Sequence, residues 1–125
     1  LLVVHQALFT NVSWGSASDG SVESRDAWLP VLEAGGVDLV VAGHFHSYQR
    51  GELNGVTYVV VGGGGASLVQ DPDQGAWAHM ALLERAWHYS IMELDGPELV
   101  WTTFGLDDDV IDRFTLTGGP VSPAP

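Results

Sequence analysis

The hydrophobic residues of this chain fall into runs of two kinds. Three short runs, at residues 1–4, 38–42 and 56–61, are almost wholly apolar, which is typical of strands buried on both faces. A later region alternates apolar and polar residues instead, and the alternation recurs at residues 89–94, 98–104 and 110–116. Alternation of this kind predicts an antiparallel meander with one buried face.

A helix is expected between the first two apolar runs. Apolar residues recur there at helical spacing, and Ser21 or Ser24 can cap a helix that extends to about Ala34. Pro30 implies a late start or a kink, and the glycine pair at residues 35–36 predicts the end of the helix. Strand, helix and strand in this order predict a βαβ unit with a parallel pair of strands, and hence an α/β protein.

The segments after residue 50 carry several turn signals. Asn54-Gly55 predicts a turn, and residues 77–86 fit either a short helix or an irregular lid. The glycine run at residues 62–65 lacks the lysine and hydroxyl residue of a phosphate-binding loop, which favours close backbone passage near a site. Residues 118–125 are typical of a linker or tail, so the domain is expected to cover residues 1–117.

Composition excludes several classes of function. The 125 residues include 4 basic and 16 acidic side chains, giving a net charge of −12, which disfavours binding to nucleic acids or to anionic membranes. A phosphorylated substrate therefore needs a metal ion or a local arginine to attract it. The chain has no cysteine, which excludes disulfides, thiolate zinc sites and cysteine nucleophiles.

Three histidines follow predicted strands. His44 and His46 come just after the run at residues 38–42, and His5 ends the run at residues 1–4. The carboxyl ends of parallel strands meet at one edge of an open sheet, where such proteins place their active sites. Neutral imidazole is a good ligand for zinc, iron and manganese. The pattern predicts a metal site, in which His44 and His46 serve either one ion or two.

The same residues resemble a known superfamily. The segment Gly43-His44-Phe45-His46-Ser47-Tyr48-Gln49-Arg50 is similar to the Gly-His-x-His-x-Tyr-x-Arg motif of calcineurin-like metallophosphoesterases of the purple acid phosphatase-like branch. Val3-Val4-His5 resembles an earlier motif of that superfamily, and the order of the elements over residues 1–117 agrees with it. The resemblance implies the C-terminal half of a four-layer α/β/β/α sandwich, with mixed and antiparallel strands after the βαβ unit.

The resemblance also implies a chemistry. His5 and His44 would bind one ion of a two-metal centre, and His46 would bind the other. The ions would be iron, manganese or zinc, and a hydroxide activated by both would hydrolyse a phosphate ester. An extracellular or periplasmic location is the one that this resemblance favours.

The chain departs from the superfamily pattern in one large respect. The superfamily's Asp-x-His, Gly-Asp and Gly-Asn-His motifs, which lie in an earlier half of the domain, do not occur here. We therefore expect the chain to need an N-terminal half as its partner, and to have little activity and a tendency to self-associate without it. Two alternatives stay open: a non-catalytic metal-binding or scaffold domain, or a fragment that is active only with its N-terminal half.

Three further residues are candidate substrate ligands. Arg50 is suited to bidentate contact with phosphate, with a structural ion pair to Glu52 or Asp38 as the alternative. Tyr48 either contacts substrate or packs beneath the site. Asn11 lies with Ser13 and Trp14 in the loop after His5, where the superfamily builds part of its substrate pocket.

Overall fold

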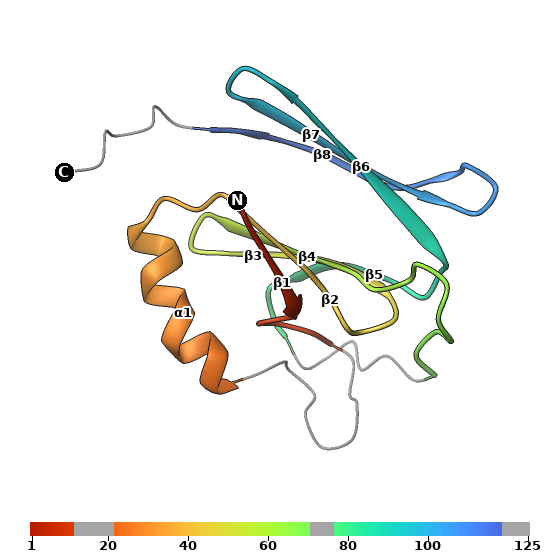
Figure 1. Ribbon diagram of the computed structural model, residues 1–125, viewed down its shortest axis with the longest axis horizontal. Coiled ribbons are helices and arrows are strands. Elements are labelled where there is room, and N and C mark those ends of the chain that lie inside the picture. The colour runs from red at the N-terminus through yellow and green to blue at the C-terminus, as the bar shows by residue number, and fades with distance from the viewer. Residues whose placement is uncertain (12–21, 71–76, 119–125) are drawn as a thin grey trace.

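The computed structural model describes residues 1–11, 22–70 and 77–118, which form one helix and eight strands in two sheets (Figure 1). Ser13, Trp14 and Ser21 lie outside the described residues, as does most of the expected tail. The described part of the chain contains no helix that is long and apolar enough to cross a membrane.

The larger sheet has five strands in the order β1-β2-β4-β3-β5. Its strands and the helix that joins the first two of them are β1 (Leu2–Gln6), α1 (Val22–Ala34), β2 (Leu39–Gly43), β3 (Tyr48–Leu53), β4 (Val56–Val61) and β5 (Met80–Glu84). β1, β2 and β4 run parallel to one another, while β3 pairs antiparallel with β4 and with β5. The expected βαβ unit and the mixed strands that follow it are confirmed.

The smaller sheet is an antiparallel meander of three strands. Its members are β6 (His88–Asp95), β7 (Glu98–Gly105) and β8 (Val110–Thr117), in the order β6-β7-β8. The predicted meander is therefore confirmed, with the strands in nearly the expected positions.

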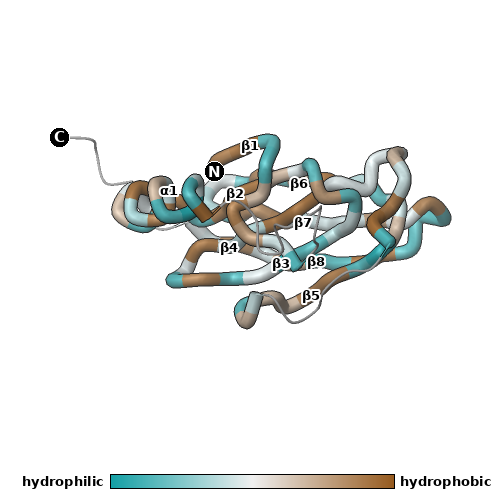
Figure 2. The backbone as a smooth tube through the Cα atoms, turned by 90° about the horizontal axis from the view of Figure 1, so that it is seen from below, coloured by the Kyte–Doolittle hydropathy of each residue, from teal (hydrophilic) through white to brown (hydrophobic). Residues whose placement is uncertain are grey.

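The five-stranded sheet packs on both faces, which explains its apolar strands. Val40 and Tyr58 join a core with Leu32 of α1, and their neighbours Leu39, Val41 and Val59 join a second core with Trp101 of β7. Successive side chains of a strand point to opposite faces, so a strand between two cores must be apolar throughout. Helix, large sheet and small sheet thus form three layers (Figure 1), and Figure 2 shows hydrophobic stretches along β2 and β4.

Two of the local signals at the ends of elements are also confirmed, whereas the late start implied by Pro30 is wrong, because α1 begins at Val22 and contains both Ser24 and Pro30. The Val37 N–H donates to the Leu32 carbonyl at 3.1 Å, and Gly36 has a φ of 61°, so the glycine pair ends α1 in a left-handed cap. Asn54 and Gly55 have φ values of 52° and 80° and make the tight turn between β3 and β4.

Two strands differ from what the sequence predicts. The segment at residues 77–86 is neither a helix nor a lid, because residues Met80–Glu84 form β5. β3 has no counterpart among the predicted strands, since its residues do not alternate. Both strands lie on the antiparallel side of the sheet, where β3 is the partner of β4 and of β5.

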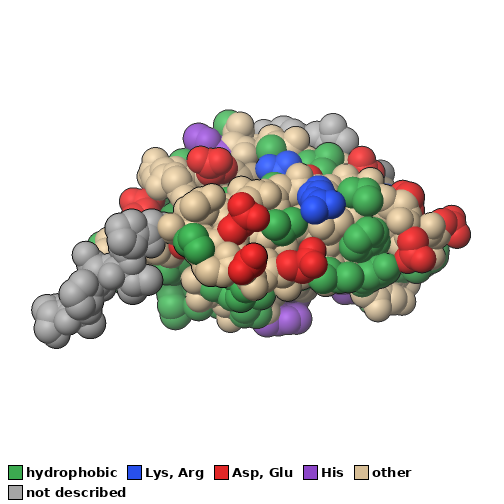
Figure 3. All heavy atoms as spheres, turned by 90° about the horizontal axis from the view of Figure 1, so that it is seen from above, with side chains coloured by type: hydrophobic (Ala, Val, Ile, Leu, Met, Phe, Trp, Pro, Cys, Tyr) green, Lys and Arg blue, Asp and Glu red, His purple; other side chains and the backbone are tan. Residues whose placement is uncertain are grey.

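The exposure of β1 and β6 also departs from expectation. Val3 of β1 is 69% exposed rather than buried, because β1 is the edge of the described sheet and only β2 flanks it. β6 is likewise an edge strand, and it exposes apolar side chains at Tyr89, Ile91 and Leu94. One buried face is therefore correct for the second half of β8, where Phe114 and Leu116 pack inward, and wrong for β6. It is also wrong for β7, because the successive residues 101–103 are all buried. Figure 3, which looks onto the side with the smaller sheet, shows apolar and acidic side chains interspersed there.

Candidate metal centre

The parallel pairing of β1 and β2 brings two of the three predicted metal ligands together. His5 lies near the carboxyl end of β1, and His44 follows the last residue of β2. His5 Nε2 lies 3.3 Å from His44 Nδ1, and the two exposed rings meet edge to face at 74°. The histidine pair is thus formed by the sheet itself and is open to solvent.

The backbone at His44 is held in an uncommon conformation. Its φ is 65°, in the left-handed region that non-glycine residues seldom adopt. Gly43, which precedes it, has no positive φ, so the histidine and not the glycine adopts the left-handed conformation after β2. Backbone outliers of this kind concentrate at functional sites, where surrounding structure holds them.

The distance within the histidine pair fits a shared metal ion. Zinc–nitrogen bonds of about 2.0–2.1 Å at a tetrahedral angle separate two ligand nitrogens by about 3.3 Å. His5 Nε2 and His44 Nδ1 are separated by 3.3 Å. The same separation also permits an N–H···N hydrogen bond between the two rings. The pair therefore fits as two ligands of one ion, and other groups must supply the rest.

His46 lies in the loop between β2 and β3, and a hydrogen bond from its ring fixes the orientation of the side chain. Its Nδ1–H donates to the Ser67 carbonyl at 2.7 Å, and its own carbonyl accepts from the Val69 N–H at 3.1 Å. A histidine that donates from Nδ1 carries its lone pair on Nε2, the arrangement found behind many metal-ligating histidines. His46 is not part of the His5–His44 pair, and the described residues include no group of three or more His, Asp or Glu suited to a metal ion.

The glycine run supports the histidine loop by close backbone contact. A Cβ built on Gly62 would lie 1.9 Å from the Phe45 carbonyl oxygen, so only glycine allows this approach. The close backbone passage expected of this run is therefore confirmed at its first glycine.

Sequence reasoning missed Gln49, which joins the two histidine-bearing loops. Its side chain is 1% exposed; Oε1 accepts from the Asn11 N–H at 2.8 Å, and Nε2 donates to Ser47 Oγ at 2.9 Å. Asn11 is buried as well, and its Oδ1 accepts from the Trp77 N–H at 2.6 Å. The only sequence signal for this network was a polar residue between Tyr48 and Arg50. Asn11 is thus engaged in the fold, and contact with substrate stays a prediction for it.

Tyr48 and Arg50 both bind Asp112, which connects the two sheets. The Tyr48 hydroxyl donates to Asp112 Oδ2 at 2.6 Å, and the Arg50 guanidinium contacts both carboxylate oxygens at 2.6 and 3.2 Å. Burial and the bond to Asp112 raise the pKa of Tyr48 above its usual value, and the same carboxylate raises the pKa of Arg50. The ion pair of Arg50 is therefore with Asp112 rather than with Glu52 or Asp38. Tyr48 packs with Trp101 in the core between the two sheets, and substrate contact by either Tyr48 or Arg50 stays a prediction.

Comparison with known proteins gives structural likeness only. Neither a protein-family model nor a curated protein sequence matches the chain. Among solved structures, GAP50, the anchor in the inner membrane complex of Plasmodium, is similar with a TM-score of 0.80 and 21% identity over 94% of this chain. Vps29 from Cryptosporidium parvum is similar with a TM-score of 0.50 and 22% identity over 78% of this chain.

These likenesses define the class of fold. Vps29 has the calcineurin-like metallophosphoesterase fold, and the chain has the same arrangement of a βαβ unit within a mixed sheet. The superfamily fold expected from residues 43–50 is thus confirmed. The chain spans 36% of the length of the GAP50 chain and 45% of the length of the Vps29 chain.

Proposed function

We propose that this chain is the C-terminal part of a metal-dependent phosphoesterase, similar to the purple acid phosphatases. His5 and His44 would hold one metal ion and His46 a second, with iron, manganese or zinc as the candidates. The observation that supports this most directly is the 3.3 Å distance between His5 Nε2 and His44 Nδ1 at the ends of adjacent parallel strands.

The residues present fit the binding of metal ions, which such a function requires first. When bound, two ions supply the positive charge that clamps a phosphoryl group and lowers the pKa of water. His5 and His44 offer two nitrogens at ligand spacing, while Ser67 fixes the ring orientation of His46. With a net charge of −12 the chain repels phosphate, so the ions also supply the attraction for the substrate.

The proposal requires a partner segment. A complete two-metal centre needs bridging and terminal carboxylates, together with an acid for the leaving group. We propose that these groups belong to an N-terminal half of the same domain. That half would face the edge of the larger sheet that carries His5, His44 and His46 (the histidine edge). Phosphate esters are the substrate class, and hydrolysis would require both halves.

Metal titration of the 125-residue chain tests the histidine centre. We expect zinc or manganese to bind by calorimetry, with His44→Ala weakening the affinity at least tenfold because one of two paired nitrogens is lost. His79→Ala is the matched control, since His79 is an exposed histidine in the turn before β5 and lies outside the centre. Equal affinity of the His44→Ala variant and the unchanged chain would contradict the metal assignment.

Turnover tests the second half of the proposal. The isolated chain should hydrolyse 4-nitrophenyl phosphate no faster than buffer containing the same metal, whereas a protein that includes the N-terminal half should turn over and lose activity on His46→Ala. Robust turnover by the isolated chain that disappears on His46→Ala would refute the need for a partner segment.

A non-catalytic scaffold is the second candidate function. It is favoured by the lack of a third His, Asp or Glu grouped with the histidine pair among residues 1–11, 22–70 and 77–118. GAP50, which is similar over 94% of this chain, is described as an anchor. A longer protein that binds metal through His44 yet shows no turnover with any phosphate ester would support the scaffold.

A further inference from the structure

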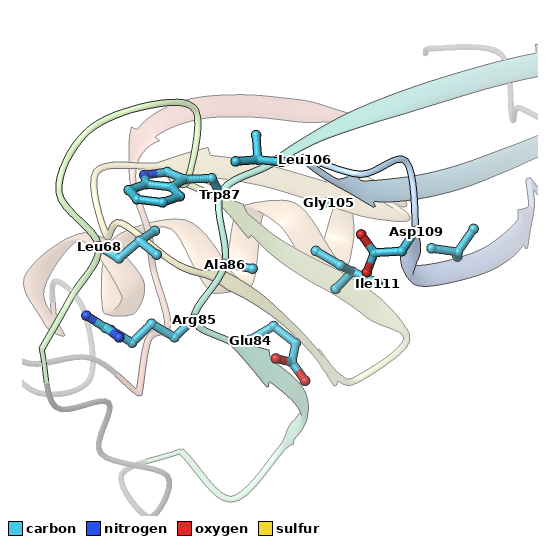
Figure 4. A pocket seen from close by; sticks show the side chains of 10 residues that line it. Leu68, Glu84, Arg85, Ala86, Trp87, Gly105, Leu106, Asp109 and Ile111 are labelled. Carbon is cyan, nitrogen blue, oxygen red and sulfur yellow. The ribbon is translucent and has the colours of Figure 1, made fainter.

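An apolar pocket of about 400 Å³ lies where the glycine run meets the start of the smaller sheet. It is lined by Gly63, Gly64, Gly65, Trp87, His88, Tyr89 and Leu106. Trp87 and Leu106 also line a neighbouring groove of about 540 Å³, and Figure 4 shows these two side chains on the same side of that groove. Volumes of this size suit a small organic ligand.

One short loop, at residues 66–67, contacts both the pocket and the histidine edge. The Trp87 indole N–H donates to the Ala66 carbonyl at 3.0 Å, and the His46 Nδ1–H donates to the Ser67 carbonyl at 2.7 Å. Because these carbonyls belong to consecutive residues, the same loop positions a wall of the pocket and a candidate metal ligand.

The aromatic walls are fixed at their polar ends and exposed on their faces. Trp87 and Tyr89 are 46% and 47% exposed, although the indole N–H of one and the hydroxyl of the other are already hydrogen-bonded. Tyr89 also stacks on Phe104, with ring centroids 5.3 Å apart. The rings are therefore held in place before any ligand arrives, which reduces the entropic cost of binding.

The floor of the pocket is open backbone. A Cβ built on Gly64 or on Gly65 would meet nothing within 4 Å, so the space above both residues is empty. His88, which is 5% exposed, forms the inner wall and packs against Gly63. Burial lowers the pKa of His88, so this wall carries no positive charge at neutral pH.

Carboxylates outnumber basic side chains around the pocket. Asp108 holds the Tyr89 hydroxyl at 2.7 Å, and the adjoining groove is lined by Glu84 and Asp109, which Figure 4 shows on either side of it. Arg85 also lines this groove and keeps its positive charge, while its guanidinium is held by a hydrogen bond to the Val69 carbonyl. Exposed aromatic faces beside carboxylates match a ligand that combines an apolar body with a positive charge.

We propose that the pocket formed by Gly64, Gly65, Trp87, Tyr89 and Leu106 binds a small organic cation, with a quaternary or alkylated ammonium group against the Trp87 and Tyr89 faces. This site does not depend on the metal centre. The ammonium group gains cation–π attraction from the rings and a favourable potential from Asp108 and its neighbours.

Choline and its neutral isostere 3,3-dimethyl-1-butanol are the probes, because they differ only in the charged nitrogen. Each is titrated into the 125-residue chain without added metal, and the Trp87 indole N–H is followed by NMR, with its assignment taken from the Trp87→Leu variant. We expect choline to shift this signal saturably and to bind about 3- to 30-fold more tightly than the isostere, the range that cation–π energies imply.

Two variants and a control separate the site from general surface binding. Trp87→Leu removes the indole signal, so choline binding to this variant is followed through the backbone amides of Gly64 and Gly65, which also line the pocket, and it should be abolished. Asp108→Asn should weaken choline binding severalfold while leaving the isostere unaffected, since Asn still accepts from Tyr89. Trp28→Leu is the matched control, because Trp28 is 45% exposed but lies on α1. Circular dichroism confirms that each variant is folded.

Three results would overturn the proposal. They are equal affinity for choline and the isostere, choline binding that survives Trp87→Leu, and the absence of any saturable shift up to 50 mM choline. Because no metal is present and His44 is unchanged, failure here leaves the metal titration untouched, and failure of that titration leaves this result untouched.

Discussion

The two sheets distribute their apolar residues differently. In the five-stranded sheet, β2 and β4 are apolar along their length and almost fully buried, because α1 covers one face and the smaller sheet covers the other. In the smaller sheet β7 is buried in its second half, while β6 exposes most of its apolar side chains. Apolar content alone therefore does not determine burial, and a strand becomes core only where a second layer lies over it.

The junction between the two sheets depends on a few large contacts. Trp101 of β7 packs with Leu39, Val41 and Val59, and Asp112 of β8 holds Tyr48 and Arg50 of β3. The comparison of the sheets thus predicts that stability resides at this junction and not along β6.

Truncation of Trp101 should have the largest effect. Trp101 is 4% exposed, and its indole N–H also donates to Thr103 Oγ1 at 2.8 Å. Trp101→Ala should lower the free energy of unfolding by about 4 kcal/mol through lost burial and the cavity left behind. Leu94→Ala on β6 is the control, because Leu94 is 66% exposed and should change stability by less than about 0.5 kcal/mol. Urea unfolding curves that show equal losses would remove the distinction between the sheets.

Removal of the shared carboxylate should have the next largest effect. Asp112→Ala leaves the Arg50 guanidinium and the buried Tyr48 hydroxyl without their acceptor. We expect a loss of about 3 kcal/mol, because an uncompensated charge and an unpaired hydroxyl remain at the junction. Asp107→Ala in the exposed turn between β7 and β8 should change little. A loss below about 1 kcal/mol for Asp112→Ala would mean that apolar packing alone joins the sheets.

A methyl group at Gly62 should disturb the edge of the larger sheet. Its Cβ would meet the backbone of Phe45, so the histidine loop must move. Gly62→Ala should cost about 2 kcal/mol, within the range for overpacking, and should weaken metal binding as measured by calorimetry. Gly64→Ala adds the same methyl group to the same run with nothing within 4 Å, and it should leave both quantities unchanged. Unaltered metal affinity of Gly62→Ala would show that the histidines do not depend on this contact.

The smallest effect concerns pH and the first residue of β6. Burial lowers the pKa of His88 below its ordinary value of 6.5, although the bond to the Ala86 carbonyl acts in the opposite direction. As pH falls through 6.5, the unfolded chain takes up a proton that the folded chain resists, so stability is lost below that pH and is complete above it. Urea midpoints measured between pH 8 and pH 5.5 should decline less steeply for His88→Gln than for the unchanged chain. Parallel declines would assign the pH dependence to other histidines.

The parts of the fold that the sequence predicted are those with a single strong local signal. The central strands β2 and β4 were predicted from almost wholly apolar runs, and the turn at Asn54 from its glycine neighbour. The meander was predicted from alternation. In each case the local preference and the tertiary environment agree, which is why pattern alone was sufficient.

β3 was missed because its polar residues are satisfied by distant partners. In isolation Gln49 and Arg50 have the character of surface residues, yet Thr10 engages the first and Asp112 the second. Those partners lie up to 62 positions away, so no local window contains them. β5 was missed for a different reason, since its short apolar run, Met80 to Leu83, fits a short helix as well as a strand.

The candidate site was predicted in its residues but not in its support. His5, His44 and His46 follow from strand ends, and the structure brings the first two within 3.3 Å of each other. The left-handed backbone at His44 and the bond from His46 to Ser67 are consequences of loop geometry, which depends on contacts between segments that are distant in sequence. The pocket beside Trp87 arises in the same way, where three separate segments meet.

The exposed edge at β1 has a kinetic consequence. Among the described residues only β2 pairs with this strand, so its outer row of N–H and C=O groups is a ready template for another strand. During refolding from denaturant, pairing within one molecule competes with pairing between molecules, and only the second process accelerates with protein concentration. The yield of monomer should therefore fall as refolding is carried out at higher concentration, even under conditions where the native monomer is the more stable state.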